Sequence, residues 1–534
     1  MSKHLGLVVS GSLDAGIQVR LDDSASVEEM TVGRYITIEG EKHRFFGMIT
    51  DISLGVINDQ VIQTPPNDTF IAQVLTGAST YGMLDVRPML TIGNVAGHEE
   101  PQPVKTVPRH FSPVKLASDI DIESVFGKED EKRFWIGNPL DMETKLCLNL
   151  EEFVKRSNGI FGKSGTGKTF LTRIMLIGML QKSKAVNLIF DMQNEYGNAG
   201  TKEGSGTVKG LQQLFPAKVA VFSLDEANSS RRGTKPDAIV KIGYDDIMPE
   251  DIAIMRQTLR LTELAVEAIY PLSRAFGKKW IQHTMEVTAE TLPEEAKNVH
   301  EGSLHSLQRG LGTLKRLPFI QEQQSAGKTA DDILRYLEMG TNVVLEFGSH
   351  RDTPTYMFVA NILSRRIYTS YQERMENAMA SAEESTKPRP LVITIEEAHT
   401  FLNPEAANQT IFGTIAREMR KYNVTLLVID QRPSGISEEV MSQLGTKISC
   451  LLDNERDIDS VLAGVSGKKE LKGVLSKLAS KQQALIFGHA VPMPAAFQVR
   501  EYGSSKSYKQ FMSTNKSETK SQAEEDAENQ IIWD

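Results

Sequence analysis

The segment "GKSGTGKT" at residues 162–169 constrains the fold of this chain more than any other stretch. Glycines in such a loop let backbone N–H groups converge on phosphate oxygens, and the following helix adds the positive end of its dipole. In this pattern Lys168 reaches the β- and γ-phosphates and the Thr169 hydroxyl binds Mg²⁺. An apolar run precedes the loop and an amphipathic pattern follows it, so a nucleotide site is favoured over a chance glycine turn. The predicted nucleotide-binding residues are Gly162, Lys163, Ser164, Gly165, Thr166, Gly167, Lys168 and Thr169.

The order of apolar patterns around this loop indicates a mostly parallel, doubly wound sheet. Strand patterns such as "AVNLIFD", "NVVLEF" and "TLLVIDQ" alternate with helical patterns, which is typical of α/β proteins. Residues 245–340 are mostly helical in pattern. We therefore expect a phosphate-loop core in two parts, 132–244 and 341–503, separated by a helical insertion over 245–340.

The two ends of the chain differ from this core. Residues 1–96 contain short strand patterns broken by glycine and aspartate, which indicate a small barrel or sandwich. Residues 97–131 begin with a proline-rich stretch and are expected to form a linker. Residues 504–534 are polar, typical of a disordered or loosely docked tail, and they end in the apolar "IIWD".

Two adjacent glutamates, Glu396 and Glu397, follow the apolar run "LVITI". Neighbouring carboxylates at the end of a buried strand repel each other unless a cation or a reaction uses them. A phosphate-loop enzyme needs one acid near magnesium and a second group that orients the attacking water, and we assign Glu396 and Glu397 to these roles. A solvated strand end beside a helix start is the competing interpretation. His399, at the start of the next helix, is assigned to support or packing.

A further strand, "TLLVI", ends at Asp430 and Gln431. Parallel strands end at one edge of a sheet, so Gln431 is expected beside the glutamates, where it senses the γ-phosphate or holds the water. A plain polar strand end is the alternative, and the role of Asp430 stays open. Asp191, Glu195 and Tyr196 follow an earlier strand, and structural capping is at least as good an interpretation for them as catalysis.

Basic residues supply two further sets of candidates. Arg417 and Arg420 lie on a helical pattern between the strand that ends at Glu396 and the strand that ends at Asp430. One of these arginines would complete a neighbouring subunit's site as an arginine finger. The alternative is a solvated basic helix face. The loops "SSRRGTKP" (229–236) and "SHRD" (349–352) are candidates for contact with a polyanion, again against a solvated alternative. The candidate DNA-binding residues are Arg231, Arg232, Lys235 and Arg351.

Composition narrows the class of protein. The 534 residues are too many for one compact core, and 40% hydrophobic with 24% charged residues is ordinary for a globular protein. No apolar run approaches the roughly 20 residues that span a bilayer, no secretory signal pattern is present, and the two cysteines indicate a reducing compartment. We expect a cytoplasmic protein without membrane contact. The net charge of −9 leaves binding of nucleic acid open.

Together these motifs resemble the HerA branch of the HerA–FtsK translocating ATPases. The resemblance rests on "GKSGTGKT", "IFDMQNEYG", "ITIEEAHTFL", "QALIFGHAVPMP" and, most specifically, residues 413–453, in which Gln-Arg-Pro precedes a Ser-Gln and a Thr-Lys pair. It covers about residues 5–500. Two positions depart from the family pattern: Glu396 stands where aspartate is frequent, and the segment from Asp191 to Tyr196 lacks the histidine and glycine of many relatives.

The resemblance implies a RecA-like P-loop ATPase core with a helical insertion, preceded by a small N-terminal β-barrel. It implies ATP and Mg²⁺ as ligands, and a homohexameric ring around double-stranded DNA with nucleotide between subunits. One subunit would contribute Lys168, Thr169, Glu396, Glu397 and Gln431, and the next subunit the arginine finger, with Arg420 favoured over Arg417. Relatives of this kind work with a separate nuclease or other effector protein in DNA end processing or anti-phage defence.

Two functions follow as hypotheses. The first is an ATP hydrolase that acts as a Mg²⁺-ATP-driven hexameric translocase or helicase on double-stranded DNA, working with such an effector. The alternative is an ATP-binding ring scaffold that assembles and activates a separate effector enzyme, with DNA translocation secondary. A coupling ATPase of the conjugation type is a weaker third reading, because the sequence contains no segment typical of a membrane span.

Overall fold

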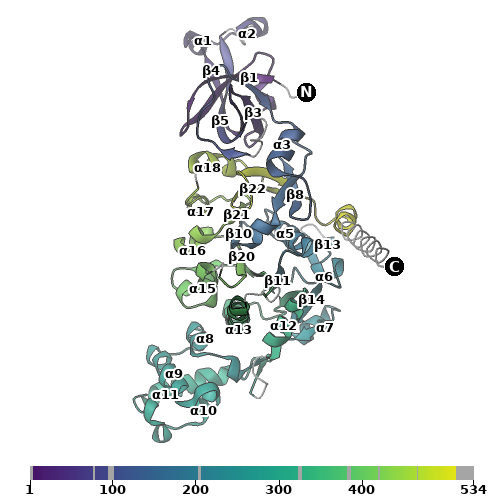
Figure 1. Cartoon of the computed structure of the whole chain (residues 1–534). Helices are drawn as coiled ribbons and strands as arrows, with labels where there is room; N and C mark the ends of the chain where they lie inside the picture. The colour runs from purple at the N-terminus through teal and green to yellow at the C-terminus, as the bar shows by residue number, and fades with distance from the viewer. Residues whose placement is uncertain are drawn as a thin grey trace, which may run out of the picture.

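The computed structural model describes residues 4–75, 79–93, 101–202, 206–322, 328–381, 387–418, 421–465 and 467–512. The molecule is elongated, with a β-barrel at one end, a large sheet with flanking helices in the middle and a group of helices at the other end (Figure 1). Within these described ranges, no helix combines the length and apolar character needed to cross a bilayer.

Six antiparallel strands close the N-terminal barrel in the order β1-β7-β3-β4-β5-β2, with β2 paired back to β5 on one side and β1 on the other. Inward side chains such as Val19, Ile36 and Ile49 are fully buried. The predicted barrel is confirmed, but it uses more of the chain than expected, because β7 lies in the predicted linker and pairs with β1 and β3. The strands are β1 (His4–Ser12), β2 (Gly16–Leu21), β3 (Tyr35–Glu39), β4 (His43–Val56), β5 (Thr80–Gly93) and β7 (Pro113–Leu116), with a short β6 (Gln102–Pro103) beside β5.

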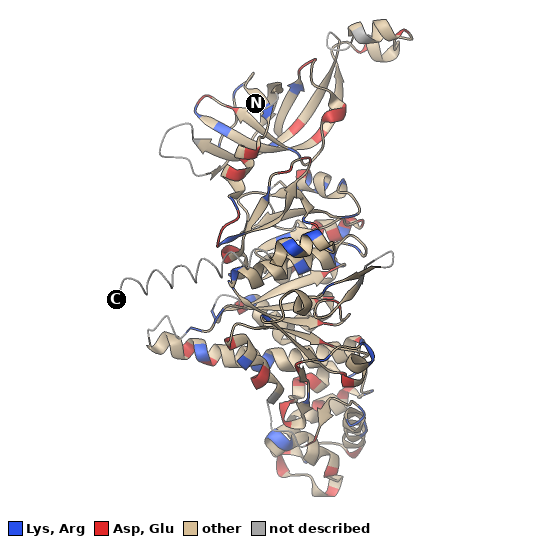
Figure 2. Ribbon diagram, turned by 90° about the vertical axis from the view of Figure 1, so that its right-hand side faces the viewer, with Lys and Arg blue, Asp and Glu red and all other residues tan. Residues whose placement is uncertain are grey.

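Strands β4 and β5 run on beyond the barrel to a projection that carries α1 (Gln60–Gln63) and α2 (Thr69–Leu75) (Figures 1 and 2). We call residues 54–75 the apolar projection. It contains no Lys or Arg, and six of its large apolar side chains are more than half exposed. Such a concentration of exposed apolar side chains is typical of an interaction surface. The six are Leu54, Ile57, Ile62, Phe70, Ile71 and Val74.

The central sheet has twelve strands in the order β15-β14-β18-β11-β19-β20-β10-β21-β22-β23-β8-β9. The strands from β15 to β21 are parallel and the last four pairings are antiparallel, which confirms the predicted mostly parallel α/β sheet. Strand β11 is buried along its whole length, as expected where helices cover both faces of a parallel sheet. The strands are β8 (Arg133–Pro139), β9 (Leu146–Asn149), β10 (Asn158–Phe161), β11 (Val186–Asp191), β14 (Val219–Ser223), β15 (Ala238–Ile239), β18 (Asn342–Glu346), β19 (Leu391–Glu396), β20 (Val424–Asp430), β21 (Thr446–Ser449), β22 (Gln483–Gly488) and β23 (Ala495–Val499).

Helices connect these strands and surround the sheet. The longest described helix, α13, passes between the sheet and the helical end of the molecule (Figure 1). The helices of this part are α3 (Asp119–Phe126), α4 (Leu150–Val154), α5 (Lys168–Lys182), α6 (Leu211–Leu214), α7 (Glu226–Arg231), α13 (Thr353–Ser381), α14 (His399–Leu402), α15 (Ile411–Glu418), α16 (Glu438–Gln443), α17 (Glu455–Val461) and α18 (Lys468–Ser476).

The far end of the molecule is a helical unit inserted between β14–β15 and β18. Its helices are α8 (Pro249–Ile254), α9 (Glu263–Phe276), α10 (Trp280–Glu286) and α11 (Glu301–Leu314). The two ends of the insertion meet in a short pair of parallel strands, β16 (Ile242–Gly243) and β17 (Ile320–Gln321). The predicted insertion reached residue 340. The structure places its last helix, α12 (Lys328–Glu338), against β11, β18 and α13, so α12 is part of the core.

The predicted polar tail begins as a packed helix. Residues 505–512 are helical, and the Phe511 ring is fully buried with its centroid 4.1 Å from the Arg500 guanidinium carbon. The Gln181 side chain of α5 donates a hydrogen bond to the Phe511 carbonyl. The remainder of the tail, including "IIWD", lies outside the described residues.

A buried ion pair fastens the insertion to the core. The Asp251 carboxylate of α8 is fully buried and accepts two hydrogen bonds of 2.7 Å from the Arg365 guanidinium of α13. Asn361, one turn earlier on α13, donates a third bond of 2.7 Å to the same carboxylate. Removal of one partner would leave a buried charge unpaired, whereas removal of both would not.

We therefore expect Arg365→Met to destabilise the protein by about 3 kcal/mol. The double variant Asp251→Leu with Arg365→Met should recover a large part of that loss, because it leaves no unpaired charge. Urea unfolding followed by circular dichroism measures both variants. A double variant that is less stable than Arg365→Met would contradict this account of the anchor.

Candidate nucleotide site

The phosphate loop and the predicted strand-end residues meet at one edge of the sheet. Strand β10 pairs with β20, with Phe161 opposite Asp430, and the loop begins at the next residue. Strand β19 lies on the other side of β20, with Glu396 opposite Ile429, and β11 follows β19. The parallel register therefore brings the loop together with the residues that end β19, β20 and β11.

Backbone geometry explains the glycines of the loop. Gly162 has φ = 151°, and a Cβ atom there would lie 2.7 Å from the Cβ of Cys450. Gly167 has φ = 101° and immediately precedes α5, so the helix N-terminus opens onto the loop. Both positions require a residue without a side chain. The loop therefore wraps its backbone around the helix N-terminus, an arrangement that suits phosphate oxygens.

The side chain of Lys168 lies across the loop. Its ammonium donates hydrogen bonds to the carbonyls of Gly162 and Lys163, the latter at 2.9 Å. Burial lowers the pKa of Lys168, and the negative charges of Glu397, Asp430 and Glu396 act in the opposite direction. The lysine is thus held in the electrostatic field of the strand-end acids.

Glu396 is half-buried, and one of its carboxylate oxygens is held by a hydrogen bond. The Tyr196 hydroxyl donates to Oε1 at 2.9 Å, while Oε2 is buried without a hydrogen-bond partner in the part of the chain that the structure describes. Burial, followed by the charge of Asp191, raises the pKa of Glu396 to about 8. An unpaired buried oxygen on an acid next to a phosphate loop fits a ligand of a hydrated magnesium ion.

The side chain of Glu397 points in a different direction from that of Glu396 because the backbone conformation of Glu397 is different. Its φ of 46° is left-handed, and its side chain is 38% exposed. Gln431 Nε2 donates to both carboxylate oxygens of Glu397, at 3.0 and 3.3 Å. The predicted proximity of these two side chains is therefore present in the structure. A polar pair of this kind can hold a water molecule for attack on a phosphate.

His399 and Asp430 lie next to the Glu397–Gln431 pair. The His399 ring nitrogen Nδ1 lies 2.9 Å from Asp430 Oδ2 and 3.7 Å from Glu397 Oε2. The hydrogen bond with Asp430 raises the pKa of His399. Glu397, His399 and Asp430 also lie close enough together to hold a cation, which gives a second place where a metal ion could bind. The sequence analysis assigns His399 to support or packing and leaves the role of Asp430 open, and this hydrogen bond fits a supporting role for His399.

The segment after β11 is held in place by hydrogen bonds to the side chain of Asp191. The Asp191 carboxylate accepts hydrogen bonds from the backbone N–H groups of Glu195 and Tyr196 at 2.8 and 2.7 Å, and of Gly197 at 3.3 Å. Burial, partly offset by these bonds, raises the pKa of Asp191 to about 7. Of the two interpretations left open by the sequence, this geometry favours capping for Asp191. Tyr196 has a more specific position, because it reaches Glu396.

The candidate basic residues differ in their exposure and in their partners. Arg417 lies on α15, one-third exposed, with Nη1 3.2 Å from Asn408 Oδ1, and Arg420 lies outside the described residues. Arg232 forms an ion pair of 3.1 Å with the buried Glu346. Its guanidinium is therefore already paired within the protein, and its contact with DNA stays a prediction. Arg231, the last residue of α7, is exposed, as are Lys235 and Arg351. The loop that carries Arg351 contacts the start of α7, where the Ser349 N–H donates a hydrogen bond to Asp225.

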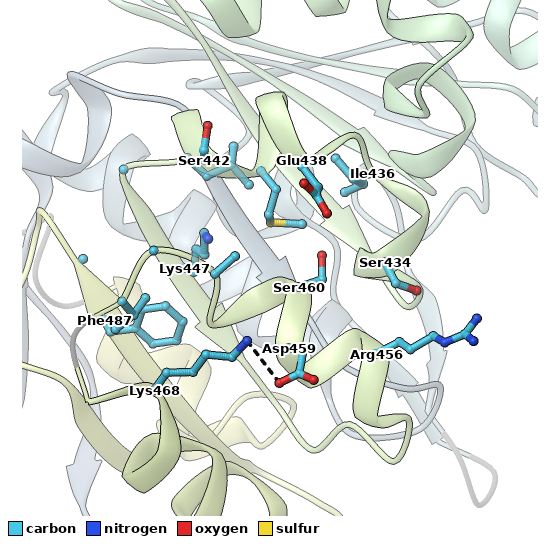
Figure 3. A pocket seen from close by; sticks show the side chains of 17 residues that line it. Ser434, Ile436, Glu438, Ser442, Lys447, Arg456, Asp459, Ser460, Lys468 and Phe487 are labelled. Carbon is cyan, nitrogen blue, oxygen red and sulfur yellow. Dashed lines mark ion pairs between the residues drawn. The ribbon is translucent and has the colours of Figure 1, made fainter. Parts of the chain in front are cut away.

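A cavity of about 720 Å³ between α16, α17 and β22 lies apart from these residues (Figure 3). Lys447 of β21 borders it and donates to the Val461 carbonyl at the end of α17, at 3.1 Å, and burial lowers its pKa to about 8. Lys468 pairs with Asp459 at 3.2 Å. None of the predicted site residues that the structure describes borders this cavity, and Lys447 serves as a cap for α17.

A phosphate loop joined to strand-end acids on a mostly parallel sheet defines a P-loop ATPase with a RecA-like core. The family model described as "Helicase HerA, central domain" matches residues 134–367. "Probable helicase MJECL08" of Methanocaldococcus jannaschii is 30% identical over 380 residues, which cover 67% of this chain and 68% of that protein. The chain belongs to the HerA helicase family of the HerA–FtsK superfamily, and it is an ATP-hydrolysing enzyme of the helicase and translocase type.

Other known proteins are similar over comparable lengths. "DNA double-strand break repair helicase HerA" of Pyrococcus furiosus is 24% identical over 444 residues, which cover 77% of this chain and 76% of that protein. Among solved structures, the bacterial conjugative coupling protein TrwBdeltaN70 is similar over 73% of this chain and 93% of its own, with a TM-score of 0.43 and 12% identity.

The raised pKa of Glu396 predicts a dependence of stability on pH. Its ordinary value is 4.5 and its folded value about 8, so between these values the native state binds more protons than the unfolded state. Stability is therefore lost as the pH rises through this window. Glu396→Gln removes the cost of ionisation, and we expect it to stabilise the metal-free protein by at least about 1.4 kcal/mol at pH 8.5, the free energy of one pKa unit.

At pH 5 the same substitution should change stability little, because Glu396 is then protonated in the folded state. Urea unfolding at both pH values, in EDTA, measures the difference. Glu397→Gln, at a 38% exposed side chain, is the control. An equal effect of Glu396→Gln at pH 5 and pH 8.5 would contradict the proton-binding state of Glu396.

Proposed function

We propose that the chain hydrolyses Mg²⁺-ATP to move along or unwind double-stranded DNA as a homohexamer. The observation that carries the catalytic part is the meeting of the phosphate loop with Glu396, and with the hydrogen-bonded Glu397–Gln431 pair, at one sheet edge. Relatives named as DNA double-strand break repair helicases support DNA as the partner.

Each side chain has a role that its surroundings support. Lys168 and the loop N–H groups bind the phosphates, and Mg²⁺ supplies neutralising charge to the phosphate oxygens. Thr169 and Glu396 Oε2 would hold the magnesium ion through its ligand shell. Glu397 orients water toward the γ-phosphate, and Gln431 fixes Glu397 by two hydrogen bonds.

Two parts of this proposal depend on other subunits and partners. An arginine from a neighbouring subunit would complete the site, and we retain Arg420 with Arg417 as the second candidate. The exposed side chains of Arg231, Lys235 and Arg351 would meet the phosphate backbone. The apolar projection supports a separate effector protein, such as a nuclease in DNA end processing or anti-phage defence, because its six exposed apolar side chains fit a protein interface.

The same apolar projection also fits one alternative function. The chain would then be an ATP-binding ring scaffold that assembles and activates an effector, with DNA movement secondary. The two functions differ in what the effector requires: a scaffold's effector stays active when ATP is bound but not hydrolysed, whereas a translocase's effector loses its processive action on DNA.

Substitution of Glu397 separates ATP binding from ATP hydrolysis. We expect Glu397→Gln to lower ATP turnover at least 100-fold, because the amide cannot accept a proton from the attacking water, while ATP still binds. Lys168→Ala should lose binding as well. Turnover is measured by phosphate release and binding by a fluorescent ATP analogue. Normal turnover by Glu397→Gln would remove Glu397 from the mechanism.

Duplex DNA should stimulate ATP turnover by the intact protein. The effect should fall steeply with salt, because phosphate contacts by Lys and Arg release counterions. The matched variant is Arg231→Ala with Lys235→Ala and Arg351→Ala, which should weaken DNA binding and leave the turnover without DNA unchanged. A ring that hydrolyses ATP but shows neither stimulation by DNA nor strand movement would refute the translocase proposal and favour the scaffold.

A further inference from the structure

The loop after β11, residues 191–198, is held from several sides at once. Asp191 accepts three of its backbone N–H groups, as described above. Asn194 exchanges hydrogen bonds of 2.9 Å with the backbone of Gly348 in both directions. Asn198 donates to the Glu346 carboxylate at 2.9 Å from its side chain. A loop fixed by this many contacts has one conformation, and its side chains have fixed directions.

The helix that follows the phosphate loop also holds this segment. Arg173 of α5, five residues after Lys168, has a nearly fully buried side chain and donates to the Glu195 carbonyl. Its guanidinium carbon also lies 5.4 Å from the centroid of the Tyr502 ring. The position of residues 195 and 196 is therefore tied to the same helix that presents Lys168.

Tyr196 extends from this loop to the acid that ends β19. Its side chain is fully buried, and its hydroxyl donates to Glu396 Oε1 at 2.9 Å. The other oxygen of the same carboxylate, Oε2, has no partner in the described part of the chain.

We infer that Tyr196 is a positioning residue for the metal ligand: its hydroxyl holds Oε1 of Glu396 so that Oε2 faces the magnesium ion. A glutamate has one more rotatable bond than an aspartate, and a hydrogen bond to one oxygen selects a single orientation of the carboxylate. The hydrogen bonds made by Asp191, Asn194, Asn198 and Arg173 hold the loop in the position from which this hydroxyl reaches Glu396. The inference rests on the proposed metal role of Glu396.

A second tyrosine provides a matched control. The Tyr356 hydroxyl of α13 accepts a hydrogen bond of 3.0 Å from the backbone N–H of Glu396. Tyr196 and Tyr356 are both fully buried beside the same residue, and each contacts Glu396 through its hydroxyl. Only Tyr196 contacts the carboxylate. Replacement of either by phenylalanine removes one buried hydroxyl, so a general loss of packing or stability affects both variants.

The test measures the Mg²⁺ dependence of nucleotide binding by the full-length protein. A fluorescent ATP analogue is titrated with and without Mg²⁺ for wild type, Tyr196→Phe and Tyr356→Phe, and urea unfolding reports the stability of each. We expect Tyr196→Phe to weaken the apparent affinity for Mg²⁺ about tenfold, the size expected for one hydrogen bond to a charged group, with metal-free nucleotide binding unchanged. Tyr356→Phe should stay within twofold of wild type.

Glu396→Asp tests whether the effect passes through the carboxylate. Its shorter side chain is withdrawn from the Tyr196 hydroxyl, so adding Tyr196→Phe to Glu396→Asp should cause no further loss of Mg²⁺ affinity. Equal Mg²⁺ affinity of Tyr196→Phe and wild type, or equal losses in Tyr196→Phe and Tyr356→Phe, would overturn the inference. If Glu396→Ala also left the Mg²⁺ dependence unchanged, the metal role of Glu396 in the proposed function would fail as well.

Discussion

The chemistry of this protein depends on acids that lie close together at one edge of a parallel sheet. Burial raises the pKa of Asp191 to about 7, with a contribution from the charge of Glu346, and burial with the charge of Asp191 raises the pKa of Glu396 to about 8. The protein alone therefore ionises these groups at a cost. The nearby Lys168 offsets part of the negative charge. A divalent cation would offset more, and its binding and the ionisation of Glu396 therefore favour each other.

The rest of the fold maintains this arrangement. The register of β10, β20, β19 and β11 sets which residues end beside one another, and left-handed backbone at Glu397 turns its side chain away from that of Glu396. Neighbouring glutamates thus have different partners, tyrosine for the first and glutamine for the second. This difference in partners supports the proposed roles of Glu396 as a metal ligand and of Glu397 as the group that orients water.

The sequence predicted most of the core and of the site, because a phosphate loop and buried strands leave strong local patterns. Gln431 was placed beside Glu397 on the expectation that parallel strands end together, and the structure has them in contact. The predictions were weaker where pairing is non-local. The sequence of β7 is typical of a linker, and only its pairing with β1 and β3 shows that it is a barrel strand. The sequence of α12 continues the helical pattern of the insertion, and only its packing on β18 shows that it belongs to the core. Neither the Tyr196–Glu396 contact nor the ion pair of Arg232 with Glu346 has a local signal, since each joins residues more than 100 positions apart.

We propose that Glu396, and not the cluster of Glu397, His399 and Asp430, holds the metal ion. A crystal structure of the protein with Mn²⁺ and a non-hydrolysable ATP analogue tests it directly, because anomalous scattering locates the manganese. The account predicts a single manganese between the Thr169 hydroxyl and Glu396 Oε2, with Glu397 still bonded to Gln431. Manganese bound by Glu397, His399 and Asp430, with Glu396 left protonated against Tyr196, would contradict it.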